Sequence, residues 1–445
     1  MGRHVGHFCS AMSFPSRLTS SKLLRNVAAV VSGTVAGQAV VFAFSPLITR
    51  IYSPEVFGLQ GVFLSLISIL SPAIALRYPM AIVVAKNEED AQQLSRLALL
   101  IAFAMSCLFS LVLLIGHGTV LTLLGAEALG ALIWFLPLAL FCVALQEVMD
   151  YRTARIGAFG LIAKVTVAQA FITNLARVLG GLFAPVASTL VTVTSVAPAL
   201  EAAMLKAGTQ RRMQSAVALT RAGAMTLLKA HRDFPLYRMP TDVLNAVAQS
   251  SPVLLLSILF SPSAAGFYTI ARSVVNLPLN VIGSAVGNVF YARIAEMARG
   301  RSPLFPFVLK ATLLQLAIPG AATLLAALAF PSLFAFVFGG SWRPAGEFAQ
   351  WMSLWVVCML TNIPSVRALP VIGRQNVHLL FNTLIMIGGI LGLLVGYALW
   401  QTASGAVAMY SVVTATIYAV QIITYLRQVR KYDRKHPYMR LPKTV

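Results

Sequence analysis

Residues 27–49 read VAAVVSGTVAGQAVVFAFSPLIT, a run without a single charged side chain. A helix needs about 20 apolar residues to cross the hydrocarbon core of a bilayer, so this run is long enough to span it. The preceding residues 1–24 are mixed and basic and lack the apolar segment of a signal peptide. We therefore expect residues 27–49 to form the first transmembrane helix, with Met12 as an alternative start to Met1.

Similar apolar runs recur along the whole chain of 445 residues, which is 58% hydrophobic and only 11% charged. Soluble domains are about 45–50% apolar and about 25% charged. Helices are the expected form, because lipid offers no partner for backbone polar groups, and the short alternating segments of a β-barrel are missing from the sequence. The sequence predicts an all-α integral membrane protein with about twelve spans. These are 27–49, 57–76, 97–115, 129–149, 158–181, 185–205, 237–260, 264–291, 306–330, 346–366, 377–399 and 405–426.

The positive charge is concentrated at alternate ends of these spans. If the N-terminus lies inside, 27 of the 34 Lys and Arg residues fall in inner segments, and the outer loops hold only Arg50 and Arg343. Cytoplasmic loops carry such an excess, so both termini are predicted to be cytoplasmic. Topology thus accounts for the net charge of +21, and no nucleic-acid partner is expected.

A short motif occurs twice, once in each half of the chain. Residues 52–58 read YSPEVFG and residues 260–266 read FSPSAAG, each just after the first span of its half. This repeat predicts two six-helix lobes with a central cavity, as in several secondary transporters. The expected boundaries are a cytoplasmic tail at 1–24, an N-lobe at 25–205, a basic linker at 206–236, a C-lobe at 237–426 and a basic tail at 427–445.

The sequence carries no signature of an enzyme. It has neither the G-x-x-x-x-G-K-[ST] phosphate loop nor H-E-x-x-H, and its four cysteines have no C-x-x-C spacing. We therefore expect no catalytic residue, no bound metal and no cofactor.

Polar side chains inside the predicted spans are costly in lipid and indicate a cavity, with hydrogen bonding between helices as the alternative. Those in spans 237–260 and 264–291 recur every three or four residues, so that each set shares a helix face. Asp242 either couples transport to an ion or pairs with Arg238 one turn away. The candidate binding residues are Arg272, Arg50, Arg238, Asn245, Gln249, Asn276, Asn280 and Gln38.

Four stretches in a constant order resemble one known family. They are SPLITRIYSPEVFG at 45–58, AGFYTIAR at 265–272, GGSWRPAG at 339–346 and VIGRQN at 371–376. Over about residues 22–426 the chain resembles the polysaccharide biosynthesis flippases, also called O-antigen or oligosaccharide translocases. These share a superfamily with the peptidoglycan lipid flippases and the multidrug and toxin extrusion antiporters.

The resemblance implies a V-shaped pair of lobes around a cationic cavity. It also implies a polyprenyl-pyrophosphate-linked oligosaccharide as substrate, moved to the outer leaflet of a bacterial inner membrane for O-antigen, capsule or exopolysaccharide. Arg272 occupies a place similar to that of an important arginine in the eighth span of the peptidoglycan flippases, and Arg50 matches a common arginine of the family.

Two other functions remain open from the sequence. A cation-coupled exporter of small molecules would share the fold, but it favours an acidic cavity, and Asp242 is nearly the only acid in a candidate cavity. A membrane polysaccharide polymerase or ligase favours a large outer loop, and the predicted outer loops are short. For the tail at 427–445 the expected partner is anionic lipid, with a polymerase or glycosyltransferase as the alternative.

Overall fold

The computed structural model describes residues 19–124, 126–210, 221–300 and 302–435, and some side chains within these ranges are not described. The described residues form helices and no strand, which confirms the all-α prediction. Residues 1–18, 211–220 and 436–445 of the predicted tails and linker lie outside the described residues. The helices are α1 (Thr19–Ile51), α2 (Pro54–Ile74), α3 (Tyr78–Val84), α4 (Glu88–Leu124), η1 (Glu127–Phe135), α5 (Leu136–Arg155), α6 (Phe159–Phe183), α7 (Ala187–Thr209), α8 (Arg221–Ala230), η2 (Phe234–Arg238), α9 (Met239–Leu259), α10 (Pro262–Val275), α11 (Leu277–Arg299), α12 (Leu304–Gln315), η3 (Leu316–Gly320), α13 (Ala321–Phe338), η4 (Gly340–Trp342), α14 (Arg343–Ala368), α15 (Gln375–Trp400) and α16 (Ala403–Lys435).

Within the described ranges, ten helical stretches are long and apolar enough to cross a membrane. The two remaining predicted spans are also helical but do not meet that measure. Span 346–366 is α14, most of whose residues are buried within the protein. Span 264–291 is divided into α10 and α11 at Asn276, because Pro278 has no N–H for the helix ladder and its ring clashes with the preceding turn.

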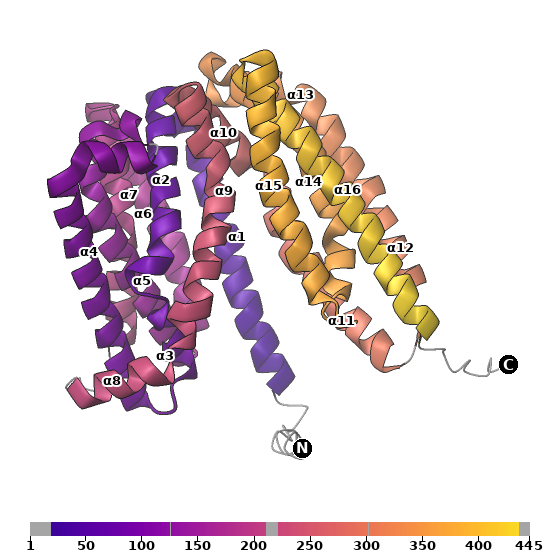
Figure 1. Cartoon of the computed structure of the whole chain (residues 1–445), viewed down its shortest axis with the longest axis horizontal. Helices are drawn as coiled ribbons and strands as arrows, with labels where there is room; N and C mark the ends of the chain where they lie inside the picture. The colour runs from indigo at the N-terminus through magenta and orange to yellow at the C-terminus, as the bar shows by residue number, and fades with distance from the viewer. Residues whose placement is uncertain (1–18, 125, 211–220, 301, 436–445) are drawn as a thin grey trace.

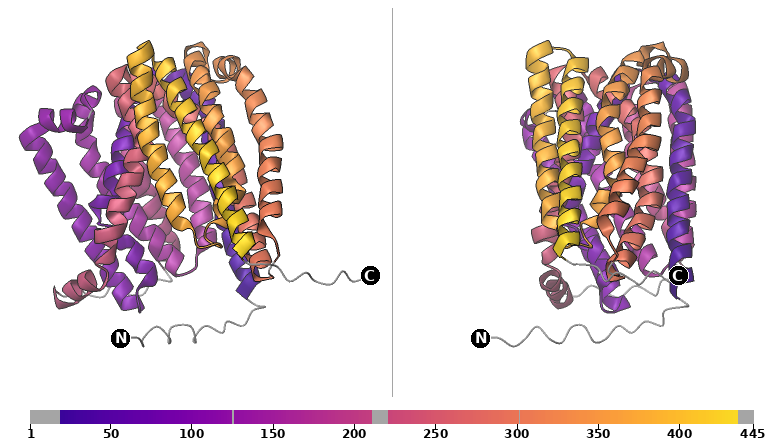
Figure 2. Two further views of the ribbon diagram at one scale, coloured as in Figure 1. Left: turned by 45° about the vertical axis from the view of Figure 1, so that its right-hand side comes forward. Right: turned by 90° about the vertical axis from the view of Figure 1, so that its right-hand side faces the viewer.

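The protein has two lobes that approach each other at one end (Figure 1). Helices α2–α7 form one group and α11–α16 the other, while α9 and α10 lie between them, packed against α2. α1 begins and α16 ends at the same end of the molecule, here called the terminal end, where the lobes spread apart (Figures 1 and 2). The opposite end, which contains the connections α1–α2 and α9–α10, is called the turn end. The positive-inside pattern predicts that the terminal end faces the cytoplasm.

The two copies of the repeated motif pack against each other at the turn end. Ser53 caps α2 by accepting a hydrogen bond from the Val56 N–H, and Ser261 caps α10 in the same way from Ala264. A Cβ on Gly58 would overlap the carbonyl oxygen of Pro262, and one on Gly266 would overlap that of Pro54. The two glycines therefore allow the backbones of α2 and α10 to touch.

Trp342 from the third motif completes this contact. Its indole is fully buried and donates to the Thr49 carbonyl at 2.9 Å. The rings of Phe57 and Phe267 meet it edge to face, with centroids 5.1 and 6.0 Å away. Three of the four motifs that carry the family resemblance thus contribute to one apolar seal between the lobes at the turn end.

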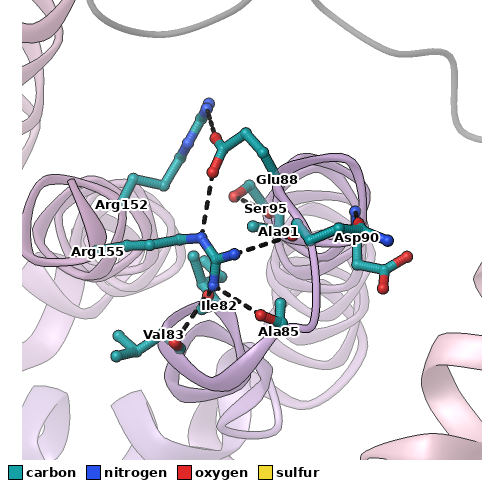
Figure 3. A network of polar contacts seen from close by, with 10 residues as sticks. Ile82, Val83, Ala85, Glu88, Asp90, Ala91, Ser95, Arg152 and Arg155 are labelled. Atoms are coloured by element: carbon teal, nitrogen blue, oxygen red, sulfur yellow. Dashed lines mark hydrogen bonds and ion pairs between the residues drawn. The ribbon is translucent and has the colours of Figure 1, made fainter. Parts of the chain in front are cut away.

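At the terminal end, a single arginine ties three helices of the N-lobe together (Figure 3). Arg155 donates to the carbonyls of Ile82 at 2.8 Å and Ala85 at 2.9 Å, at the end of α3, and its Nε lies 3.1 Å from a Glu88 oxygen at the start of α4. Arg152 reaches the other oxygen of Glu88 at 3.5 Å. Basic residues that the positive-inside pattern attributes to topology therefore also hold the ends of helices in place at the terminal end.

Arg155→Ala is expected to lower the stability of the folded protein by about 2–3 kcal/mol, because buried carbonyls of α3 and the Glu88 carboxylate lose a charged donor. The measurement is the temperature at which the detergent-purified protein aggregates. Arg293→Ala is the matched control, since Arg293 is exposed and its ion pair among the described residues is with Glu296, three residues away. Equal aggregation temperatures for the two variants would contradict the assignment.

The predicted linker 206–236 contains additional helix. α7 continues to Thr209, and α8 occupies residues 221–230. Leu227 of α8 is buried in a small core with Tyr78, Leu94 and Val148 of the N-lobe, which anchors α8 across the terminal end.

Candidate substrate cavity

A polar cavity of about 550 Å³ lies between α2 on one side and α9 with α10 on the other. The N-lobe contributes the hydroxyls of Ser65 and Ser68 and, at the terminal end, the guanidinium of Arg77. The opposite wall consists of the side chains that the sequence predicted on one face of each helix. These are Asp242, Asn245 and Gln249 of α9, with Arg272 and Asn276 at the end of α10.

Arg272 is the cation at the centre of this wall. Its Nη1 donates to the Gln249 carbonyl at 2.6 Å and its Nη2 to Gln249 Oε1 at 2.9 Å. Two hydrogen bonds to one residue fix the plane of the guanidinium, which lines the cavity and has five N–H donors in all. The break at Asn276 places Arg272 in the last turn of α10, where the negative end of the helix dipole favours a cation.

Two further cavities continue from this wall into the C-lobe. The second, of about 400 Å³, shares Asn245, Gln249, Arg272 and Asn276 with the first. The third, of about 430 Å³, shares Met359, Asn382 and Tyr418 with the second. The three cavities therefore form one continuous series from α2 to α16, with Arg272 where the first two meet.

The series is cationic as a whole. Among the described residues that line it, Asp242 is the only carboxylate, whereas Arg77, Arg272 and Arg367 contribute guanidinium groups. Asp242 is already compensated, because one of its oxygens lies 2.8 Å from Arg77 Nε and 3.1 Å from Arg238 Nε. Arg77 is itself paired with Asp242 and with Glu147, so the net positive charge of the lining comes from Arg272 and Arg367.

Arg77 lines the cavity, although in the sequence it is only one of the basic residues predicted for the inner loops. Leu76 and Arg77 both have positive φ, at 50° and 59°, a conformation that non-glycine residues rarely adopt. This sharp turn between α2 and α3 directs Arg77 to Glu147 of α5 at 2.6 Å as well as to Asp242. Strained backbone of this kind is found preferentially at functional sites, but hydropathy and spacing give no sign of it.

Three of the predicted site residues do not line these cavities. Arg238 is half exposed and pairs with Asp242, which is the alternative that the spacing left open. Arg50 lies at the turn end and donates to the Phe336 carbonyl at 3.2 Å, so in this structure it ties α1 to the end of α13. Gln38 is exposed on α1.

The fourth, Asn280, lies in α11, and its side chain is outside the described residues. Because α11 starts after the break at Asn276, Asn280 lies in a different helix from Arg272.

Comparison with solved structures shows the same fold. A lipid II flippase, MurJ, in an inward closed conformation aligns with a TM-score of 0.70 at 10% identity, covering 91% of this chain and 89% of that one. An inward-facing MATE-family transporter of the MOP superfamily aligns with a TM-score of 0.59 at 12% identity over 93% and 96%. A single-residue mutant of the Vibrio cholerae MATE transporter VcmN gives 0.56 at 15% identity over 93% and 97%. These likenesses confirm the expected two-lobe transporter fold.

Comparison of the sequence itself gives the family. No curated protein matches the chain significantly. The family model described as polysaccharide biosynthesis protein matches residues 47–304, which is more than half of the chain. The match includes residues 47–58 of the first motif, the whole second motif and the cavity-wall residues of α9 and α10. The chain is therefore a multi-pass membrane protein that belongs to the polysaccharide biosynthesis protein family.

Proposed function

We propose that this protein flips a polyprenyl-pyrophosphate-linked oligosaccharide from the cytoplasmic to the outer leaflet of a bacterial inner membrane. The observation that carries the proposal is the position of Arg272, a guanidinium held between the lobes at the junction of cationic, amide-lined cavities. Family membership and the likeness to a lipid II flippase support a lipid-linked substrate.

The physical problem of such a transport step is the headgroup. Each hydroxyl moved into hydrocarbon without a partner costs several kcal/mol by the harsher scale, and a charged pyrophosphate costs far more. In the proposed mechanism Arg272 attracts the pyrophosphate, while Asn245, Gln249 and Asn276 replace its water. The polyprenyl tail stays in the lipid between the lobes.

Movement then follows from rocking of the lobes between this conformation and one that opens at the turn end. An anion that leaves a negative cytoplasm gains roughly 2.3 kcal/mol per charge per 100 mV of membrane potential. Coupling to an ion through Asp242 stays a prediction. In the present conformation its ion pair with Arg77 ties α9 to the N-lobe, whereas its pair with Arg238 lies within one helical turn of the same segment.

Deletion of the gene in its host tests the proposal. We expect loss of surface O-antigen, capsule or exopolysaccharide, with the lipid-linked oligosaccharide retained on the cytoplasmic leaflet. Normal surface glycan would contradict the proposal and favour a small-molecule exporter, whereas unpolymerised units on the outer leaflet would favour a polymerase.

A further inference from the structure

The C-lobe part of the cavity series has a different chemistry from the part beside Arg77. Three helices each present one stripe of side chains to it, with aromatic rings and amides in place of ion pairs. α14 contributes Trp355, Met359 and Asn362, which share a face at spacings of four and three residues. α15 contributes Asn382, and α16 contributes Tyr418 and Gln421.

Two buried polar atoms in this region have no hydrogen-bond partner among the residues that the structure describes. The Trp355 side chain lines the second cavity, is 8% exposed, and has an indole N–H without an acceptor. The Asn362 side chain lines the third cavity, is 2% exposed, and has an Oδ1 without a donor. A buried group left without a hydrogen bond is costly, and most such groups in folded proteins are paired.

The orientation of Asn362 is fixed by its neighbours. Its Nδ2 donates to Gln421 Oε1 at 2.8 Å, and Gln421 Nε2 donates to the Tyr425 hydroxyl at 2.7 Å. The Tyr425 hydroxyl is 2.9 Å from His378 Nδ1. Because this chain of bonds engages Nδ2, it leaves Oδ1 as the free acceptor of Asn362. The acceptor is therefore held in place before any ligand arrives.

We propose that the second and third cavities form a glycan subsite, which binds the sugars next to the pyrophosphate while Arg272 binds the pyrophosphate itself. A sugar hydroxyl both donates and accepts, so it satisfies either orphaned atom, and a ring face packs against the aromatic walls. Trp355 and Asn362 lie two helical turns apart, about 10 Å along the axis, so they contact different parts of an extended glycan.

The charge of the subsite restricts the sugar. Among its described lining residues there is no carboxylate, and Arg367 and His378 lie at its far end from Arg272. A sugar with a free amino group would bring a positive charge to this wall without a partner. The subsite therefore takes neutral or acidic sugars.

The inference rests on the proposed function, and one binding experiment separates the two. The full-length protein in nanodiscs is titrated with lipid-linked oligosaccharide extracted from host cells and, separately, with undecaprenyl pyrophosphate that carries no sugar. Native mass spectrometry reports the bound fraction. We expect the wild type to prefer the glycosylated carrier. Trp355→Phe, which keeps a ring, and Asn362→Leu should each weaken binding of that carrier about tenfold and leave the bare carrier unchanged.

The matched control is Trp351→Phe, the same change one turn away on α14 at an exposed side chain, and it should alter neither affinity. Equal wild-type affinity for both carriers, or equal weakening of both by Trp355→Phe and Asn362→Leu, would overturn the subsite and leave the flippase proposal standing. Failure of the wild type to bind either carrier would overturn the flippase proposal and the subsite with it.

Discussion

Arg272→Ala is expected to reduce transport of the lipid-linked oligosaccharide by roughly 100-fold or more while the protein still inserts and folds. A hydrogen bond to a charged group contributes about 1.5–3 kcal/mol, and each 1.4 kcal/mol corresponds to a tenfold change. Loss of two such bonds to the pyrophosphate gives the expected magnitude. The fold should survive, because the partner that Arg272 leaves behind, Gln249, has an exposed side chain at the cavity wall.

The measurement is the amount of surface glycan in a deletion strain complemented with each variant, normalised to membrane-inserted protein. Arg272→Lys should retain partial activity, because lysine keeps the charge but lacks the planar fork that binds phosphate through two donors. Arg50→Ala is the control, since Arg50 bonds a carbonyl at the turn end and lines none of the described cavities. Wild-type glycan in the Arg272→Ala strain would show that this arginine does not bind the substrate.

Gly58→Ala is expected to shift the protein out of the conformation described here. An added Cβ would overlap backbone atoms of Pro262, and backbone cannot move aside as a flexible side chain can. Overpacking of this kind costs about 1–3 kcal/mol, enough to change the ratio of two conformations roughly 10- to 100-fold. Since the strain is relieved when α2 and α10 separate, the turn end should stay open. Gly266→Ala should act in the same way through Pro54.

A cysteine at Thr269, in an otherwise cysteine-free chain, reports this opening. Thr269 lines the first cavity below the glycine contact. Its labelling by a membrane-impermeant thiol reagent added outside the cell should be low in the parent and rise with Gly58→Ala. Gly340→Ala is the control, because a Cβ at Gly340, also near the turn end, meets no atom within 4 Å. If labelling stays at the parent level in both Gly58→Ala and Gly266→Ala, the contact between α2 and α10 does not close the turn end.

The sequence is sufficient to predict the helices and the polar wall that α9 and α10 present to the first cavity. Long uncharged runs can only be satisfied as helices in lipid, and the three- and four-residue spacing of Asp242, Asn245 and Gln249 places them on one face wherever α9 packs. The break at Asn276 follows from Pro278 and was predictable in principle. The expectation of an unbroken span gave too little weight to the missing N–H.

Other features depend on tertiary packing that no local pattern encodes. Nothing in the spacing says which side of α1 faces a cavity, and Gln38 and Arg50 do not line the cavities where Arg272 and its neighbours lie. Arg77 was missed because its role depends on a positive-φ turn and on carboxylates from two distant helices. In the sequence, Trp355 and Asn362 do not differ from other residues of a span. Their place in a cavity depends on the packing of α14, α15 and α16 around it.

Transport by the purified protein tests the central claim most directly. Lipid-linked oligosaccharide from host cells is reconstituted into vesicles with the wild type, with Arg272→Ala or without protein, and a membrane-impermeant oxidant then attacks only outward-facing sugars. In wild-type vesicles we predict that nearly all of the oligosaccharide becomes oxidised, whereas about half stays protected without protein and with Arg272→Ala. If half stays protected in wild-type vesicles too, even with an imposed membrane potential, the protein does not flip this lipid.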